Sequence, residues 1–509
     1  MERQAGMAAE QWKVLGVIVA VLVVLAALTG LSGGLYFVKH EVDMLHLVDL
    51  VLRRAGGGIP HVDYHTPIGA LAFEPFAALK RAGLSLGEAL AWGQVLVAAL
   101  VAPGAWWAAT RRLDGWLAIG FAAAVPLIAG ALVYGATGTG ISLSMHYNRW
   151  AWAVAFAPLL IAALPSKRPA AVGDGVVVGV SMAVLALMKI TYFVGFAPAV
   201  LAGLALRREW RVLSVSLIAG LAVCVLMTLG YGVGFWMAYL GDLREISSSG
   251  VRSAPVEAAL SHVVIWPKYV GATLVGIGTL WWLRKQGSTM AAVLLTMTLI
   301  LPGAIYASYQ NYGHDPIWLI WWAFVVLALR PREPSLNGAV VAGVAALVLI
   351  FPVAVNMVLS PVRPLVQPKA KFEPLLATED KIYGVSARFK EETGKVRLGS
   401  GKCQLIGGAV ARMRREVETL KAAGLGEKPV LEADLLNVQW LFGGVPLDGG
   451  APWYFGGLPG VEAAQLVAVP KCPAVPETRD MILSKLEAAG VVLMPVLQDD
   501  MMDVFEVQR

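Results

Sequence analysis

The chain has 509 residues and a formal net charge of +6, with 57% hydrophobic residues and only 15% Asp, Glu, Lys and Arg. Soluble domains carry about 25% charged residues, so the composition excludes both a lone soluble domain and a disordered chain. It predicts an all-α polytopic membrane protein. We therefore attribute the positive charge to membrane topology and expect no nucleic-acid partner.

The first apolar run extends from Val14 to Val38. It is longer than the roughly 7–15 apolar residues of a signal-peptide core, and no A-x-A cleavage site closes it. We expect an uncleaved first membrane span, with a cleaved signal peptide as the alternative.

Ten further apolar runs bring the predicted number of spans to eleven. They cover 88–110, 115–136, 149–165, 172–188, 190–206, 212–232, 263–283, 289–309, 316–329 and 337–359. A single helix over 172–206 would be about 52 Å long, well beyond the roughly 30 Å hydrocarbon core, so we divide it at an outward turn at 189–192.

Basic residues occupy every second connection between these runs. They are Arg111 and Arg112, Lys167 and Arg168, Arg207, Arg208 and Arg211, Arg284 and Lys285, and Arg330 and Arg332. Cytoplasmic loops are enriched in Lys and Arg. The pattern predicts a multi-pass protein of the plasma (inner) membrane, with a cytoplasmic N-terminus and a periplasmic or extracellular C-terminal domain.

The composition of the chain changes after Leu359. A segment with two prolines, Pro361 and Pro364, leads into a sequence of mixed polarity with many charged residues. A helical pattern at 410–424 and Val- and Leu-rich segments at 429–432, 465–469 and 490–497 predict a small α+β domain. The predicted organisation is a transmembrane domain at 1–360, whose first external loop spans 39–87, and an extracytoplasmic domain at 361–509.

Two of the three cysteines, Cys403 and Cys472, lie in this predicted extracytoplasmic domain, and the third lies within a span. Disulfides persist on that side of the membrane. We predict a Cys403–Cys472 disulfide, with two unpaired buried thiols as the alternative.

The first external loop carries the densest group of polar residues. Apolar residues recur at helical spacing over 41–54, which predicts an amphipathic helix in the plane of the membrane interface. Asp43 and His46 are three residues apart and share a face of that helix. A breaker-rich return follows at 60–67, and 73–79 is expected to form a second interfacial helix.

The loop has a recognisable order of features. It begins with an acidic residue after the first span and an interfacial helix. G-x-x-P at 57–60, Asp63 and T-P-x-G at 66–69 then follow. The pattern resembles the first external loop of the GT-C superfamily of polytopic glycosyltransferases, which includes protein mannosyltransferases and aminoarabinose transferases. Members use polyprenyl-phosphate-linked sugars. The resemblance covers roughly 1–360 and implies an acidic catalytic residue at the outer membrane face, which maps onto Asp43.

The loop departs from the family pattern at two places. The common Asp-Glu pair is absent because Met44 follows Asp43. The return lacks the Lys-Pro-Pro of the aminoarabinose transferases, so acceptor and phosphate contacts cannot be carried over from that subgroup.

Sugar transfer from a lipid phosphate needs a carboxylate that accepts the acceptor proton and cations that hold the phosphate. Asp43 is the expected base and Asp63 the alternative; if neither acts, Asp43 is a solvated helix residue. Arg149 and Lys189 are the expected phosphate ligands, although Lys189 could instead extend to the interface. The other candidate substrate-binding residues are His46, His65, His146, Tyr147, Asn148, Tyr192, Tyr309, Asn311, His314 and Asp315.

These patterns predict a hexosyl- or pentosyltransferase that moves a sugar from a polyprenyl-phosphate donor to an envelope glycan, lipid or protein. We expect no resident cofactor besides that donor substrate, and the loop histidines leave a divalent metal open. A secondary transporter or lipid flippase, or a non-catalytic subunit of a cell-envelope assembly, are the alternatives. A transporter would need polar residues at mid-membrane and paired halves, whereas here the polar residues gather at one face.

Overall fold

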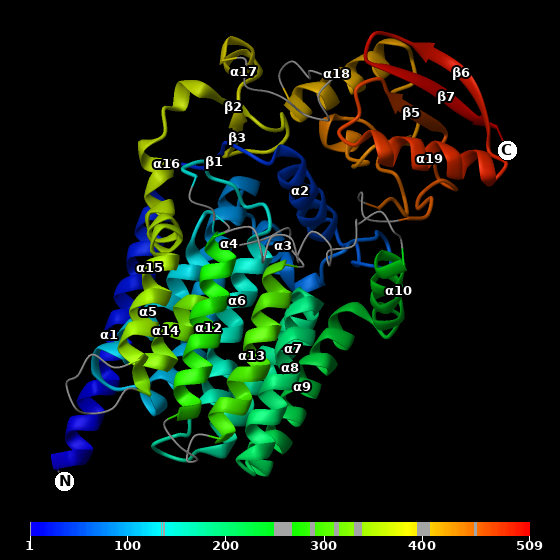
Figure 1. The fold of residues 1–509 in the computed structure, drawn as a ribbon. Helices are drawn as coiled ribbons and strands as arrows, with labels where there is room; N and C mark the ends of the chain where they lie inside the picture. Colours follow the sequence, from blue (N-terminus) through cyan, green and yellow to red (C-terminus); the bar gives the residue numbers. More distant parts are fainter. Residues whose placement is uncertain are drawn as a thin grey trace.

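The computed structural model describes residues 2–133, 135, 138–248, 267–285, 291–309, 315–329, 338–393, 408–451 and 456–508. It is mostly helical, with a bundle of long helices and a smaller part that contains strands (Figure 1). The N-terminus lies at one end of the bundle, and the strand-containing C-terminal part lies beyond the other end.

Among the described residues, fourteen helices and one short strand form the bundle and its external loop. In chain order these are α1 (Glu2–Leu31), β1 (Leu35–Phe37), α2 (Glu41–Ala55), α3 (Glu74–Arg81), α4 (Leu86–Arg112), α5 (Gly115–Gly130), α6 (His146–Ala163), α7 (Ala171–Met188), α8 (Ile190–Leu206), α9 (Trp210–Tyr231), α10 (Gly234–Ser248), α12 (Pro267–Lys285), α13 (Ala291–Tyr309), α14 (Trp318–Ala328) and α15 (Gly338–Leu359).

Five helices among the described residues are long and apolar enough to cross a membrane. They are Ala8–Leu31, Leu86–Arg112, Ala171–Met188, Trp210–Tyr231 and Gly338–Val366. Other predicted runs are helical but shorter, and α14 has only 11 residues. The helices are consistent with a membrane protein, while the number of eleven spans stays a prediction.

The predicted first span, 14–38, is wrong at its C-terminal end. Helix α1 ends at Leu31, and Leu35–Phe37 forms β1, which pairs in parallel with β3 (Ile382–Val385). Gly33 and Gly34 have φ angles of 69° and 148°, which end the helix, and a Cβ at Gly34 would lie 2.7 Å from the Lys381 carbonyl oxygen. These two glycines let the chain leave the helix and reach β3.

The predicted break in the 172–206 run is confirmed. Helix α7 ends at Met188 and α8 begins at Ile190, so Lys189 alone separates them in an extended conformation. The break places a lysine at a helix junction rather than in the middle of a helix.

Helix α6 lies inside the bundle. It packs against α4, α7 and α8, and nearly every one of its residues is buried. The first residue of α6, His146, is polar, and its side chain contacts the external loop at the Ala72 carbonyl.

The C-terminal part contains the helix and the three strands that the sequence predicts, as α18 (Gly408–Ala422), β4 (Val430–Glu432), β5 (Leu466–Pro470) and β6 (Val492–Gln498). Its remaining elements are α16 (Arg363–Val366), β2 (Phe372–Pro374), α17 (Ala387–Thr393), α19 (Pro476–Ala488) and β7 (Met502–Gln508). One sheet has the order β1-β3-β2 and the other β4-β5-β7-β6, in which only β4 and β5 are parallel.

Candidate active site

A small pocket, partly open to solvent, lies between α2 and the start of α6. Four of the predicted site residues line it: Asp43 and His46 from α2, and His146 and Tyr147 from α6. Pro67 and Ile68, on the return of the external loop, line it as well. The structure thus brings together residues that are about 100 positions apart in the sequence.

Asp43 stands in the first turn of α2, on the face that it shares with His46. The hydroxyl of Ser144 donates a hydrogen bond to its Oδ2 at 2.5 Å. Burial raises the pKa of the Asp43 carboxyl above its usual range, although the Ser144 hydrogen bond and His40 act in the opposite direction. A raised pKa makes this carboxylate a stronger proton acceptor than an exposed aspartate.

His46 is buried behind Asp43, and burial lowers its pKa to about 4. Its imidazole is therefore neutral at physiological pH. A neutral imidazole in the same pocket can form a hydrogen bond to a substrate hydroxyl, and it does not form an ion pair with Asp43.

His146 connects the external loop to α6. Its Nδ1 lies 3.0 Å from the Leu143 carbonyl oxygen, and its Nε2 lies 2.6 Å from that of Ala72. Its ring packs edge-on against Phe76 and Trp150. Because both ring nitrogens contact the backbone, His146 holds the wall of the pocket in place.

Lys189 lies next to the pocket although it does not line it. Its Nζ is 5.3 Å from the centroid of the Tyr147 ring, and the residue is nearly buried at the junction of α7 and α8. A cation over an aromatic face is attracted by the ring quadrupole. The contact joins the Lys189 side chain to Tyr147, which is one of the residues that line the Asp43 pocket.

The structure does not bring Arg149 to the pocket. Its guanidinium is fully buried and donates to the Val133 carbonyl oxygen at 2.6 Å and to Oε1 of Gln94 at 2.8 Å. These contacts join α6 to α4. Asn148 and Tyr192 are also buried inside the bundle and do not line the pocket.

Asp63 and His65 lie elsewhere in the external loop. The exposed Asp63 accepts a hydrogen bond from the Ile59 amide at 2.6 Å and so stabilises a turn. His65 donates through Nδ1 to Oδ1 of Asp242 at 2.6 Å, and His61 donates to Oδ2 of the same carboxylate at 2.7 Å.

Asp242, on α10, is a residue that the sequence analysis missed. Burial alone would raise the pKa of this carboxyl, but the hydrogen bonds from His61 and His65 lower it overall. The hydrogen bond to Asp242 in turn raises the pKa of His65. Asp242 is 177 positions from His65, and no local pattern joins the two.

The last group of predicted residues is only partly described. Tyr309 is the final residue of α13, and Asp315 is buried at the start of the segment that leads to α14. Asn311 and His314 lie outside the described residues. Cys472 is disulfide-bonded and Cys224 is free, but Cys403 lies outside the described residues, so the predicted pairing stays a prediction.

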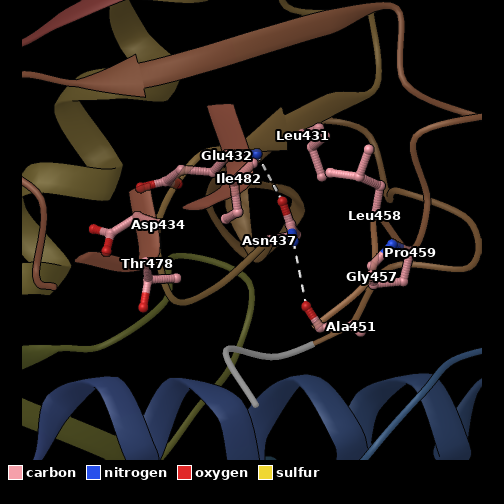
Figure 2. Close-up of a pocket in the computed structure, with 10 residues that line it drawn as sticks. All are labelled: Leu431, Glu432, Asp434, Asn437, Ala451, Gly457, Leu458, Pro459, Thr478 and Ile482. Atoms are coloured by element: carbon pink, nitrogen blue, oxygen red, sulfur yellow. Dashed lines mark hydrogen bonds between the residues drawn. The ribbon is translucent and has the colours of Figure 1, made fainter. Parts of the chain in front are cut away.

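A second small pocket lies in the C-terminal part and is lined by Glu432 and Asp434 (Figure 2). Arg412 pairs with both carboxylates, at 2.9 Å and 3.0 Å, and burial raises the pKa of Glu432 well above its usual range. Asn437 donates to the Ala451 carbonyl and accepts from the Glu432 amide. The two carboxylates of this pocket are paired with Arg412, so we place the candidate active site at Asp43.

The described residues contain no group of three His, Cys, Asp or Glu side chains close enough to hold a metal ion. What the Asp43 pocket offers is a proton acceptor of raised pKa, a neutral imidazole and a neighbouring ammonium group. No family model, curated protein or solved structure matches the chain.

Proposed function

We propose that the chain is an integral membrane glycosyltransferase that moves a sugar from a polyprenyl-phosphate donor to an envelope glycan, lipid or protein. The proposal depends on one observation above all. The carboxylate of Asp43 lies in a pocket that Tyr147 also lines, and the Lys189 ammonium group lies 5.3 Å from the centroid of the Tyr147 ring.

The Asp43 carboxylate suits the proton transfer of the reaction, and the Lys189 ammonium group suits the departure of the phosphate. Asp43 accepts the proton of an acceptor hydroxyl, whose oxygen then forms a bond to the anomeric carbon of the donor sugar. The bond from that carbon to the phosphate oxygen breaks, and the polyprenyl phosphate leaves with the bonding electron pair. Lys189 stabilises the negative charge on the departing phosphate.

Other side chains around the pocket keep this arrangement in place. The neutral His46 is within the same pocket and can accept or donate a hydrogen bond to a sugar hydroxyl. His146 fixes the external loop to α6 through Ala72. In this proposal His46 contacts the substrate and His146 is a positioning residue.

The proposed topology has eleven spans, a cytoplasmic N-terminus and an external C-terminal domain in the plasma (inner) membrane. The separation of the N-terminus and the C-terminal sheets at opposite ends of the bundle supports this orientation (Figure 1). So does the alternation of basic connections along the sequence. Under this topology the Asp43 pocket opens at the outer face.

The test is a transfer assay of the purified full chain in detergent, with labelled polyprenyl-phosphate sugars of different kinds. Water serves as the acceptor where none is known, so release of the labelled free sugar is the readout. Asp43→Asn preserves size but removes the proton acceptor, and we expect turnover to fall about 100-fold or more.

Asp63→Asn is the matched control, because Asp63 is an exposed turn residue of the same loop. We expect it to keep near-normal turnover. Normal turnover of Asp43→Asn together with an inactive Asp63→Asn would move the base to Asp63. Full activity of both variants would remove the carboxylate mechanism.

A further inference from the structure

Two arginines lie at the end of the bundle that also carries the N-terminal half of α1. Arg112 is the last residue of α4, and Arg207 directly follows α8. Near the same end of α4, the indole of Trp106 donates to the Gln11 carbonyl of α1 at 3.3 Å. Helix α6 begins at the Asp43 pocket, and its C-terminal end contacts both arginines, so the two places lie at opposite ends of the bundle.

Both arginines bind the C-terminal end of α6. Arg207 donates through Nη2 to the Ile161 carbonyl at 2.6 Å, and Arg112 donates through Nε to the Leu164 carbonyl at 3.1 Å. Pro165 has no amide hydrogen, so the Ile161 carbonyl has no helical partner four residues later. The two acceptors are three residues apart, and residues at this spacing are neighbours on a helix surface. The two guanidinium groups therefore lie close together.

These bonds leave three guanidinium nitrogens without a partner. Arg112 also donates through Nη2 to Oδ2 of Asp174 at 2.7 Å, and Oδ1 of Asp174 accepts from the Trp107 indole at 2.8 Å. Nη1 of Arg112 and both Nε and Nη1 of Arg207 are buried, with no hydrogen-bond partner among the described residues. Buried polar groups in folded proteins are nearly always hydrogen-bonded, and a charged group needs a partner most. The three nitrogens therefore indicate a ligand that accepts hydrogen bonds.

Two further arginines lie beside this pair. Arg111 lies over the Trp107 ring, 3.8 Å from its centroid, and donates to the Arg168 carbonyl at 2.8 Å. Both Arg111 and Arg168 are half-buried. Lys167 pairs with Asp114 at the surface, so that pair adds no net charge.

The neighbouring carboxylates do not balance the four arginines. Burial lowers the pKa of the Arg207 guanidinium to about 10, and the charge of Arg112 acts in the same direction. Glu209 and Asp174 oppose this effect. Two carboxylates among the described residues thus accompany four arginines, which remain charged at neutral pH. The excess of positive charge favours an anionic ligand.

We propose that Arg112 and Arg207 form a binding site for a phosphate group, supplied by an anionic phospholipid headgroup or by free phosphate. Guanidinium groups bind phosphate oxygens through several N–H donors at once, and three donor nitrogens are unpaired here. Under the proposed topology this end of the bundle faces the cytoplasm, where anionic lipids attract basic residues beside the membrane. The site does not depend on the proposed sugar transfer, because it lies at the other end of α6 from Asp43.

The experiment measures binding of dioleoyl phosphatidylglycerol to the purified, delipidated full chain in detergent by native mass spectrometry. Arg207→Gln removes one cation at a half-buried position and leaves a polar side chain. Arg211→Gln is the matched control, since Arg211 is exposed on the first turn of α9 and its replacement removes the same charge. We expect the Kd to rise about ten-fold for Arg207→Gln and to stay unchanged for Arg211→Gln.

Two conservative variants keep the test valid if Arg207→Gln does not fold, which its melting temperature without lipid shows. Arg207→Lys and Arg112→Lys retain the charge but lose the planar set of donors. We expect each to raise the Kd several-fold, by less than Arg207→Gln. An unchanged Kd in both lysine variants would overturn the proposal.

Calorimetric titration with inorganic phosphate distinguishes the two sources of the phosphate group. Binding of phosphatidylglycerol that depends on Arg207, with weaker binding of dioleoyl phosphatidylcholine and of inorganic phosphate, would assign the site to an anionic headgroup. Binding of inorganic phosphate that depends on Arg207, with no preference between the two lipids, would assign it to free phosphate. Equal Kd values of Arg207→Gln and Arg211→Gln for both anionic probes would overturn the proposal.

Discussion

The indole N–H of Trp440 donates a hydrogen bond to Oδ1 of Asp49 at 2.7 Å, and this bond joins the C-terminal part to α2. Arg53 donates to the same oxygen at 2.8 Å, and its guanidinium lies 5.4 Å from the centroid of the Trp440 ring. Since α2 also carries Asp43, the C-terminal part holds the helix of the candidate base from outside.

Replacing Trp440 by Phe should therefore weaken this attachment. The ring remains, but Asp49 loses one hydrogen bond, and bonds to charged groups contribute about 1.5–3 kcal/mol. We expect a lower melting temperature and a several-fold lower transfer rate, measured on the same preparation. Trp210→Phe, at a residue that is 60% exposed on α9, should change neither quantity. Equal values for both variants would mean that the C-terminal part does not position α2.

The rate should depend on pH through Asp43. The base works when deprotonated, so the rate falls as the pH drops through the raised pKa of this carboxyl. Ser144→Ala removes a hydrogen bond that favours the charged form. We expect the acidic limb of the kcat profile to move to higher pH, whereas Ser214→Ala on α9 should leave it in place. A shift to lower pH would contradict the role of Ser144.

A substitution at Lys189 should affect binding of the donor more than proton transfer to Asp43. Lys189→Ala removes the cation next to Tyr147 and should raise the donor KM about ten-fold, because charge-assisted contacts to phosphate are lost. Lys189→Arg keeps the charge and should restore much of the binding. Lys167→Ala, at an exposed ion pair with Asp114, is the control. Single-turnover kinetics separate this effect from that of Asp43→Asn, and an unchanged KM would exclude Lys189 from the donor site.

The contact between His65 and Asp242 should make stability depend on pH. The pKa of His65 is raised in the folded protein, so its stabilising contribution is complete below about pH 6.5 and is lost as the pH rises through the raised pKa. The pKa of Asp242 is lowered, so its contribution is lost only as the pH falls through that lowered value. Thermal unfolding of the wild type should lose more stability between pH 5.5 and 8.5 than that of His65→Gln. Parallel losses would show that this contact does not control the pH dependence.

Local patterns in the sequence were enough to predict many elements of this protein. The 172–206 run is too long for one span, and the chain breaks at Lys189 as predicted. The spacing of Asp43 and His46 places them on one face of α2, and both line the same pocket. Each of these predictions depends on the helical period or on length, which are properties of neighbouring residues.

The tertiary structure decided the features that depend on distant partners. Arg149 donates hydrogen bonds to Gln94 and to the Val133 carbonyl. Helix α6 is buried on all sides, so the sequence of α6 does not indicate which neighbour a polar residue contacts. Strand β1 forms only because β3, more than 340 positions later, offers a pairing edge. The pocket itself exists because His146 binds the Ala72 carbonyl and brings the external loop onto α6. The sequence determined which helices and polar side chains this chain has, while packing between distant segments determined which of those side chains meet.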